Sequence, residues 1–135
     1  MAEFRKVTDR FSVSPQITPD DARDAAASGV ALIISNRPDG EVPGQPTNAA
    51  IEAAATAAGA AFRRIPVVGR PTPEQAAEQA AAVAAAEGPV LAFCRSGTRS
   101  ITAWALGEAA NGRDRRELLR LAAAAGYDLS PLLQG

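Results

Sequence analysis

Short apolar runs alternate with helix-forming segments along most of this chain, and this alternation limits the fold more than any other feature. The runs are rich in branched and aromatic side chains, as buried strands are, and cover residues 11–13, 30–34, 60–65 and 89–93. Helices are expected over residues 19–28, 47–58 and 73–87, with two more beginning near Thr98 and Asp114. The sequence therefore predicts an α/β fold of three layers, in which helices flank a mainly parallel sheet of four to five strands.

Two of the expected helices carry clear start signals. Each begins with Thr-Pro, at residues 18–19 and 72–73, which places a capping hydroxyl before a proline whose φ suits the first turn. The alanine-rich residues 76–86 are therefore interpreted as helix rather than as a linker, because alanine is the strongest helix former. Gly29 and Gly88 are expected to end these two helices in the left-handed conformation.

Composition argues against several classes of protein. A length of 135 residues suits one domain, spanning residues 1–135. A net charge of -1 gives no basic face for nucleic acid, and no apolar stretch is long enough to span a bilayer. The absence of histidine removes the commonest metal ligand and general base, so neither a metal nor another cofactor is expected. A single cysteine forms no internal disulfide, which favours a cytoplasmic protein.

That cysteine lies in the sequence Phe-Cys-Arg-Ser-Gly-Thr-Arg-Ser, residues 93–100. Cys94 follows a predicted strand and precedes a predicted helix, so its sulfur would face the N–H groups of a glycine-containing turn and the positive helix end. Arg95 and Arg99 add positive charge. Such surroundings favour a thiolate, so we expect Cys94 to be a nucleophile rather than a small core residue. Trp104, in the following helix, is expected to pack in the core.

The spacing of the cysteine and the arginine bears on which atom is transferred. Four residues separate Cys94 from Arg99. A loop of this length turns its amides around a cup sized for one further sulfur atom, whereas one more residue would widen the cup for a tetrahedral phosphate. The spacing thus favours sulfur transfer. Ser100 stands where the wider frame would have its arginine, so Arg99 would have to bend back to bind phosphate.

Two further loops are expected beside the cysteine loop, because loops at the carboxyl ends of parallel strands share one edge of the sheet. They are residues 36–41, Asn-Arg-Pro-Asp-Gly-Glu, and residues 67–70, Val-Val-Gly-Arg. The first has the composition of a turn, in which Asp39 satisfies backbone groups and Gly40 takes a positive φ. Arg37 and Asp39 are equally candidates for binding an anionic substrate.

Together these segments resemble the β-lactamase-hydrolase-like, phosphatase-like domain family, which is related in fold to the dual-specificity phosphatases. The resemblance extends from about Phe4 to Ala105, and the motifs that carry it are residues 11–16, 36–41, 65–67 and 94–100. The cysteine loop is also similar to the CRxGxR loop of rhodanese-type sulfurtransferases. The resemblance implies sulfur transfer and, as a partner, a metallo-β-lactamase-like persulfide dioxygenase, to which some family members are fused.

The chain departs from the phosphatase pattern in the loop that follows residues 65–67. The related phosphatases place a general-acid aspartate there, whereas this chain has Val68, Gly69 and Arg70. Loss of a positioned acid costs about a hundred- to ten-thousand-fold when an alkoxide must leave, but sulfur transfer expels a good leaving group unaided. Asp39 is the residue that could replace the missing acid.

The sequence therefore predicts a sulfurtransferase that moves a sulfane sulfur from thiosulfate or a glutathione persulfide to a thiol acceptor, through a persulfide on Cys94. Arg99 is the second catalytic candidate, and the hydroxyls of Thr98 and Ser100 are expected to bond to the cysteine sulfur. The candidate anion-binding residues are Arg95, Ser96, Gly97, Thr98, Ser100, Arg37 and Asp39. The alternatives are a phosphatase-like hydrolase with a phosphocysteine intermediate, and a non-catalytic module that binds an anion or docks a partner.

Overall fold

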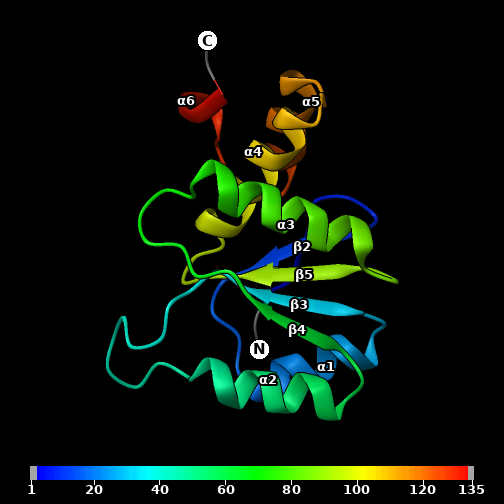
Figure 1. Cartoon of the computed structure of the whole chain (residues 1–135), viewed down its shortest axis with the longest axis vertical. Coiled ribbons are helices and arrows are strands. Elements are labelled where there is room, and N and C mark those ends of the chain that lie inside the picture. The colour runs from blue at the N-terminus through cyan, green and yellow to red at the C-terminus, as the bar shows by residue number, and fades with distance from the viewer. Residues whose placement is uncertain (1–2, 134–135) are drawn as a thin grey trace.

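The computed structural model describes residues 3–133 and shows a five-stranded sheet between two layers of helices (Figure 1). From one edge to the other, the strands are β1 (Arg5–Lys6), β2 (Phe11–Ser14), β5 (Val90–Phe93), β3 (Leu32–Ser35) and β4 (Ala61–Arg64). The last four are parallel, and β1 pairs antiparallel with β2. The predicted α/β fold with a mainly parallel sheet is therefore confirmed, and only β1 is too short to be recognised in the sequence.

Helices cover both faces of this sheet (Figure 1). The pairs are α1 (Pro19–Ala27) with α2 (Asn48–Ala57) on one face, and α3 (Pro73–Ala85) with α4 (Thr98–Ala110) on the other. Beyond α4 lie α5 (Arg115–Ala124) and the short α6 (Ser130–Leu133). The five predicted helices are confirmed, whereas α6 is too short to be predicted. No helix within residues 3–133 is long and apolar enough to cross a membrane.

The predicted helix caps are confirmed at three of four positions. Thr18 and Thr72 both form capping boxes, and Gly29 follows α1 with a φ of 108°. The prediction for Gly88 is wrong, because α3 ends at Ala85 and the next residue is already extended. A left-handed cap would have provided donors for the carbonyls at the end of the helix. Here Arg10 provides them instead, because its guanidinium donates to the carbonyls of residues 83 and 86 at 3.1 and 2.9 Å.

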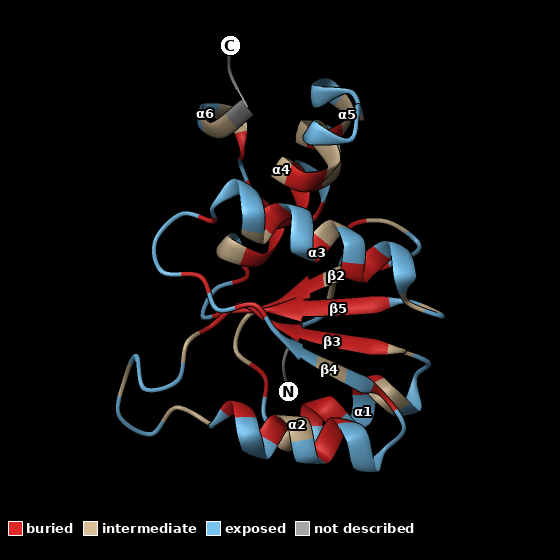
Figure 2. Cartoon of the chain, in the orientation of Figure 1, coloured by how far each residue is buried: buried red, intermediate tan, exposed pale blue. Residues whose placement is uncertain are grey.

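The core lies on both faces of the two central strands, β3 and β5, which are buried along their whole length (Figure 2). Successive strand side chains point to opposite faces, so Ile33 packs with residues of α1 and α2, whereas Ile34 packs with residues of α4. Trp104 is 3% exposed and stacks on Phe11 with ring centroids 5.7 Å apart, which confirms its predicted place in the core. Because β3 and β5 are neighbours, the loops that leave them begin side by side.

Candidate active site

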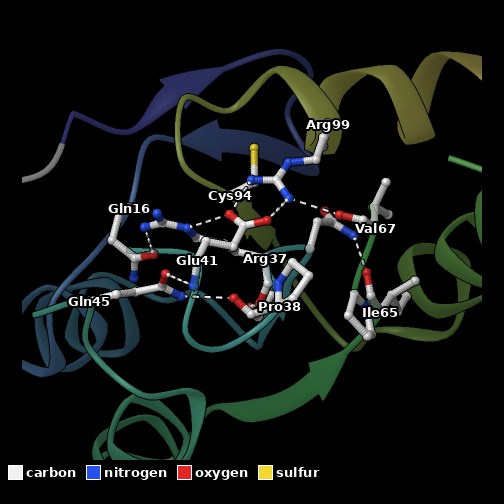
Figure 3. Close-up of polar contacts among 12 residues, drawn as sticks. Gln16, Arg37, Pro38, Glu41, Gln45, Ile65, Val67, Cys94 and Arg99 are labelled. Atoms are coloured by element: carbon white, nitrogen blue, oxygen red, sulfur yellow. Dashed lines mark hydrogen bonds and ion pairs between the residues drawn. The ribbon is translucent and has the colours of Figure 1, made fainter. Parts of the chain in front are cut away.

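Three loops meet at the carboxyl edge of the sheet, as the strand order predicts (Figure 3). The backbone N–H of Asn36, which follows β3, donates to the carbonyl of Phe93 at the end of β5, 2.8 Å away. The Arg99 side chain, from the first turn of α4, reaches both Glu41 after β3 and the carbonyl of Val67 after β4. The site is thus assembled from segments far apart in the sequence.

Hydrogen bonds from buried amide side chains connect these loops to one another and to α3. The Asn36 side-chain amide donates to the Ile65 carbonyl at 3.0 Å and to the Gln79 side chain of α3 at 2.8 Å. Gln79 in turn donates to the Ser100 carbonyl at 3.1 Å. Both amide residues are fully buried, and hydrogen bonds in such surroundings are costly to lose. Gln79 is a structural contributor that the sequence, which shows it only as part of an alanine-rich helix, does not reveal.

Cys94 directly follows β5, and its sulfur accepts the backbone N–H of Gly97 at 3.1 Å. Gly97 has a φ of 93°, in the left-handed region that favours glycine. Cys94 is 0% exposed, and the Arg99 side chain that lies beside it is 17% exposed (Figure 3). An anion therefore reaches the sulfur only when the surrounding side chains shift.

The carbonyls of the cysteine loop are held from outside. The Arg95 carbonyl accepts the backbone N–H of Gln16 at 3.2 Å, and the Ser96 carbonyl accepts the Tyr127 hydroxyl at 2.8 Å. In a planar trans peptide the N–H points opposite to the carbonyl, so these contacts turn the N–H groups of the next residues, Ser96 and Gly97, to the inside of the loop. The bond from Gly97 to the sulfur is the observed result.

The start of α4 differs from that of the other long helices. Side chains of Thr18, Thr47, Thr72 and Asp114 cap α1, α2, α3 and α5, whereas the N-cap of α4 is Gly97, which has no side chain. The N–H groups in the first turn of a helix have no partners within the helix, and its dipole makes this end positive. Together with the loop amides, the start of α4 gives the cysteine an environment suited to an anion.

Arg99 is oriented so that one edge of its guanidinium is left for a ligand. Of the five donors on an arginine, Nη1 uses two, on Glu41 and on the Val67 carbonyl, at 2.7 and 2.8 Å. Nη2 uses one on Glu41 at 2.8 Å. The two remaining donors belong to Nε and Nη2 and share one edge of the fork. The hydrogen bonds to Glu41 are the main reason that the pKa of Arg99 is raised, burial lowers it, and the charge of Cys94 raises it further. The guanidinium lies beside the sulfur of Cys94 (Figure 3). Arg99 thus bends back toward the cysteine despite the shorter spacing.

Glu41 connects two arginines. Its carboxylate accepts both bonds from Arg99 and a third, at 2.8 Å, from Nε of Arg37. The hydrogen bond from Arg99 is the main reason that the pKa of Glu41 falls to about 2, and Arg37 adds to this effect while burial opposes it. Glu41 is therefore ionised at neutral pH and cannot donate a proton there. The sequence shows it only as the last residue of a turn-forming loop, so its role is not predicted.

Arg37 lies next to this carboxylate and is buried. Its side chain is 4% exposed, and besides Glu41 it donates to the side chain of Gln16 at 3.0 Å (Figure 3). The remaining nitrogen, Nη2, is buried and has no hydrogen-bond partner among residues 3–133. The structure therefore places Arg37 beside the predicted anion site, where it fixes Glu41.

Asp39 faces a different part of the molecule. Its carboxylate accepts the backbone N–H of Asn48, the first residue of α2, at 2.8 Å, and lies 4.0 Å from Arg64. Gly40 has a φ of 74°, as predicted for the turn. The hydrogen-bonded group around Arg99 includes Glu41 and Arg37, whereas Asp39 is engaged at the start of α2. It thus occupies the turn role rather than the position of a general acid beside the sulfur.

The other predicted residues of the cysteine loop are placed less closely than expected. Arg95, Ser96 and Thr98 are exposed, and the Ser96 hydroxyl donates to that of Thr98 at 3.0 Å. Ser100 is buried, and its hydroxyl has no partner within the described part of the chain. The predicted hydrogen bonds from Thr98 and Ser100 to the sulfur are therefore absent among residues 3–133, because Thr98 points outward at the start of α4. Residues 3–133 also contain no cluster of three or more potential metal ligands.

Comparison with known proteins identifies the family of this chain. Residues 3–111 match the family described as beta-lactamase hydrolase-like protein, phosphatase-like domain. The chain belongs to this family. A beta-lactamase hydrolase-like protein of Xylella fastidiosa is 42% identical over 127 residues, which are 91% of this chain and 29% of that protein. The chain thus spans less than a third of the length of the curated relatives that it matches.

Solved structures show the same fold. A Neisseria meningitidis protein named as a candidate phosphatase is 36% identical, with a TM-score of 0.84 over 96% of this chain and 92% of that one. A cysteine-to-serine variant of P. aeruginosa TpbA, solved with phosphotyrosine, is 16% identical, with a TM-score of 0.64 over 96% of this chain and 82% of that one. The second likeness concerns the fold alone. The predicted resemblance, to a family with a phosphatase-like fold, is confirmed.

The ionised Glu41 gives a prediction for stability. Because its pKa in the folded state, about 2, lies below the ordinary value of 4.5, its stabilising effect is complete above pH 4.5 and is lost as the pH falls toward 2. Glu41→Gln should therefore lower the thermal midpoint by a few degrees at pH 6, and the difference from wild type should shrink between pH 4.5 and 2. Thermal unfolding of both proteins at several pH values measures this.

The matched control is Glu78→Gln, which removes an exposed ion pair with Arg63. Exposed pairs contribute little, so its midpoint should stay close to that of wild type at every pH. A midpoint difference for Glu41→Gln that stays constant from pH 6 to pH 2 would contradict the assignment of an ionised, paired Glu41.

Proposed function

We propose that this chain is a cysteine-dependent hydrolase of phosphomonoesters with good leaving groups, acting through a phosphocysteine at Cys94. One observation carries the proposal: the sulfur of Cys94 accepts the N–H of Gly97 and lies beside the Arg99 guanidinium, which has two donors left over (Figure 3). Two parallel N–H donors match two oxygens of a phosphoryl group, and further donors come from the loop amides and the start of α4. The phosphatase-like fold of the family supports this choice.

The reaction has two steps. The Cys94 thiolate attacks phosphorus, the bond from phosphorus to the ester oxygen breaks, and the phenolate or alkoxide leaves with the electron pair and takes a proton from solvent. Water then attacks phosphorus in the phosphocysteine, the phosphorus–sulfur bond breaks with its electron pair on sulfur, and the protons of the water leave with inorganic phosphate or pass to solvent. In both steps Arg99 and Gly97 would hold the equatorial oxygens, where charge is concentrated in the transition state. Glu41 and the Val67 carbonyl would keep Arg99 in the required orientation.

The leaving group decides which esters react. Residues 66–70 contain no acidic side chain, Asp39 is bound at the start of α2, and Glu41 is ionised. With no acid to protonate the departing oxygen, an alkoxide leaves slowly, and the cost is about a hundred- to ten-thousand-fold. Aryl esters avoid this cost, since a phenolate leaves without a proton.

The test compares two substrates on the same preparation, 4-nitrophenyl phosphate and glycerol phosphate, by release of inorganic phosphate. The aryl ester should be hydrolysed at least about a hundred-fold faster than the alkyl ester. Equal rates would show that a general acid is present and that the leaving-group argument is wrong. No phosphate from either substrate would reject the hydrolase proposal itself.

Sulfur transfer is the second candidate, and the missing acid is the observation that favours it. A thiolate that takes a sulfane sulfur from thiosulfate releases sulfite, which needs no proton donor. The spacing of four residues between Cys94 and Arg99 also suits a smaller group than phosphate. Formation of thiocyanate from thiosulfate and cyanide by the same preparation, without phosphate release from 4-nitrophenyl phosphate, would make this candidate the preferred one.

A further inference from the structure

Tyr127 lies outside residues 3–111, the part of the chain that matches the family, yet it contacts the cysteine loop. It follows α5, where Gly126 has a φ of 98° and the backbone N–H of Tyr127 bonds back to the Ala122 carbonyl at 2.9 Å. The residue is 8% exposed and belongs to the main core cluster. Its ring is thus fixed by the end of α5 and by packing.

The Tyr127 hydroxyl contacts the cysteine loop and lies close to the Cα of Gly97. It donates to the Ser96 carbonyl at 2.8 Å. A Cβ atom placed on Gly97 would lie 2.1 Å from the same hydroxyl oxygen and 3.0 Å from the ring carbon that carries it. Gly97 therefore has two reasons to be glycine, its positive φ and the approach of Tyr127.

The peptide between Ser96 and Gly97 transmits this contact to the sulfur. Its carbonyl points to Tyr127 and its N–H points to Cys94, in bonds of 2.8 and 3.1 Å. Rotation of this planar unit would move both ends together, so a hydroxyl that holds the carbonyl also holds the N–H.

We infer that Tyr127 is a positioning residue, whose hydroxyl sets the Gly97 N–H that stabilises the Cys94 thiolate and the oxygens bound over it. Burial is the main reason that the pKa of Tyr127 is raised; the charge of Arg5, which lies over the ring, lowers it, and the charge of Cys94 raises it, so that the hydroxyl stays protonated and donates. Arg99 also carries charge near the sulfur, but it donates to Glu41 and to the Val67 carbonyl rather than to the Ser96 carbonyl. The inference rests on the proposed role of Cys94 as nucleophile.

The test is Tyr127→Phe, which keeps the ring and removes only the hydroxyl. The first readout is the rate at which iodoacetamide alkylates Cys94 at pH 7, which does not depend on any enzymatic activity. This rate should fall about ten-fold, as expected for loss of one well-placed hydrogen bond to a reactive centre. With 4-nitrophenyl phosphate, kcat should fall by a similar factor.

The matched control is Asp128→Ala. Asp128 is the next residue along the chain, and its carboxylate accepts the backbone N–H and the hydroxyl of Ser130 at 2.9 and 2.6 Å, so the change removes these bonds and leaves the bond from Tyr127 to Ser96 in place. Its alkylation rate should stay within two-fold of wild type, although its thermal midpoint falls. A Tyr127→Phe rate equal to or above that of wild type, or equal effects of the two variants, would overturn the inference. Slow alkylation of Tyr127→Phe in a protein that releases no phosphate would leave the inference standing and reject the proposed hydrolase.

Discussion

Cys94→Ser should lower kcat for 4-nitrophenyl phosphate by at least about a thousand-fold. Serine replaces the sulfur by an oxygen whose proton stays in place at neutral pH, and the chain has no histidine to remove it. The Gly97 N–H can still donate to the new oxygen, so the loop keeps its shape. Steady-state kinetics measures the change, and an unchanged far-UV circular dichroism spectrum shows that the fold is kept.

A second outcome distinguishes this effect from a general disturbance of the loop. The serine variant should still bind inorganic phosphate, because Arg99 and the loop amides remain. Its dissociation constant, measured by calorimetry, should be within a few-fold of wild type. Retention of a tenth or more of the wild-type kcat would show that another residue is the nucleophile.

Arg99→Lys should lower kcat/KM by about a hundred- to a thousand-fold, the usual cost of removing a donor to a developing anion. Lysine keeps the charge, but its ammonium is a compact point charge without the planar, two-sided donor arrangement of a guanidinium. It therefore cannot bond to Glu41 and to two substrate oxygens at once. The loss should appear in both kcat and KM, since the guanidinium binds the ground state as well. Kinetics with 4-nitrophenyl phosphate measures both constants.

The control is Arg70→Lys. Arg70 is exposed on the loop after β4, next to the segment that contacts Arg99. Replacing it by lysine makes the same chemical change outside the site. Its kinetic constants should match those of wild type. If Arg99→Lys also matched wild type, charge alone would be sufficient, and the argument from the free guanidinium edge would be wrong.

The features that the sequence predicts are those whose signals are local. Cys94 and Arg99 stand in one short motif between a strand and a helix, and their nearness follows from that connection alone. The meeting of the three loops also follows, because the parallel order of β3, β4 and β5 puts the ends of these strands at one edge. Helix caps such as Thr18 are recognised for the same reason.

The features that the sequence does not predict depend on contacts between distant residues. Glu41 is 58 residues from Arg99, and Tyr127 is 31 residues from Ser96. Nothing in the neighbours of either residue indicates its partner. The failure at Gly88 has the same origin, because Arg10, 76 residues before Ala86, satisfies the end of α3. Local patterns therefore identify the candidate reactive groups, whereas the residues that orient these groups become visible only in the folded chain.

Loop length alone does not decide which group is transferred. The spacing predicts a cup for sulfur unless Arg99 bends back, and in the structure Arg99 does lie beside Cys94, drawn into position by Glu41 and the Val67 carbonyl. A count of residues describes the backbone of the loop, but the size of an anion site depends equally on where the long arginine side chain is held.

What becomes attached to the sulfur distinguishes the two chemistries most directly. The protein would be mixed with 4-nitrophenyl phosphate or, separately, with thiosulfate, quenched in acid within one turnover, and analysed by intact and peptide mass spectrometry. We predict that the peptide containing Cys94 gains one phosphoryl group from the ester and nothing from thiosulfate. A single added sulfur from thiosulfate, with no phosphoryl adduct from the ester, would contradict the account.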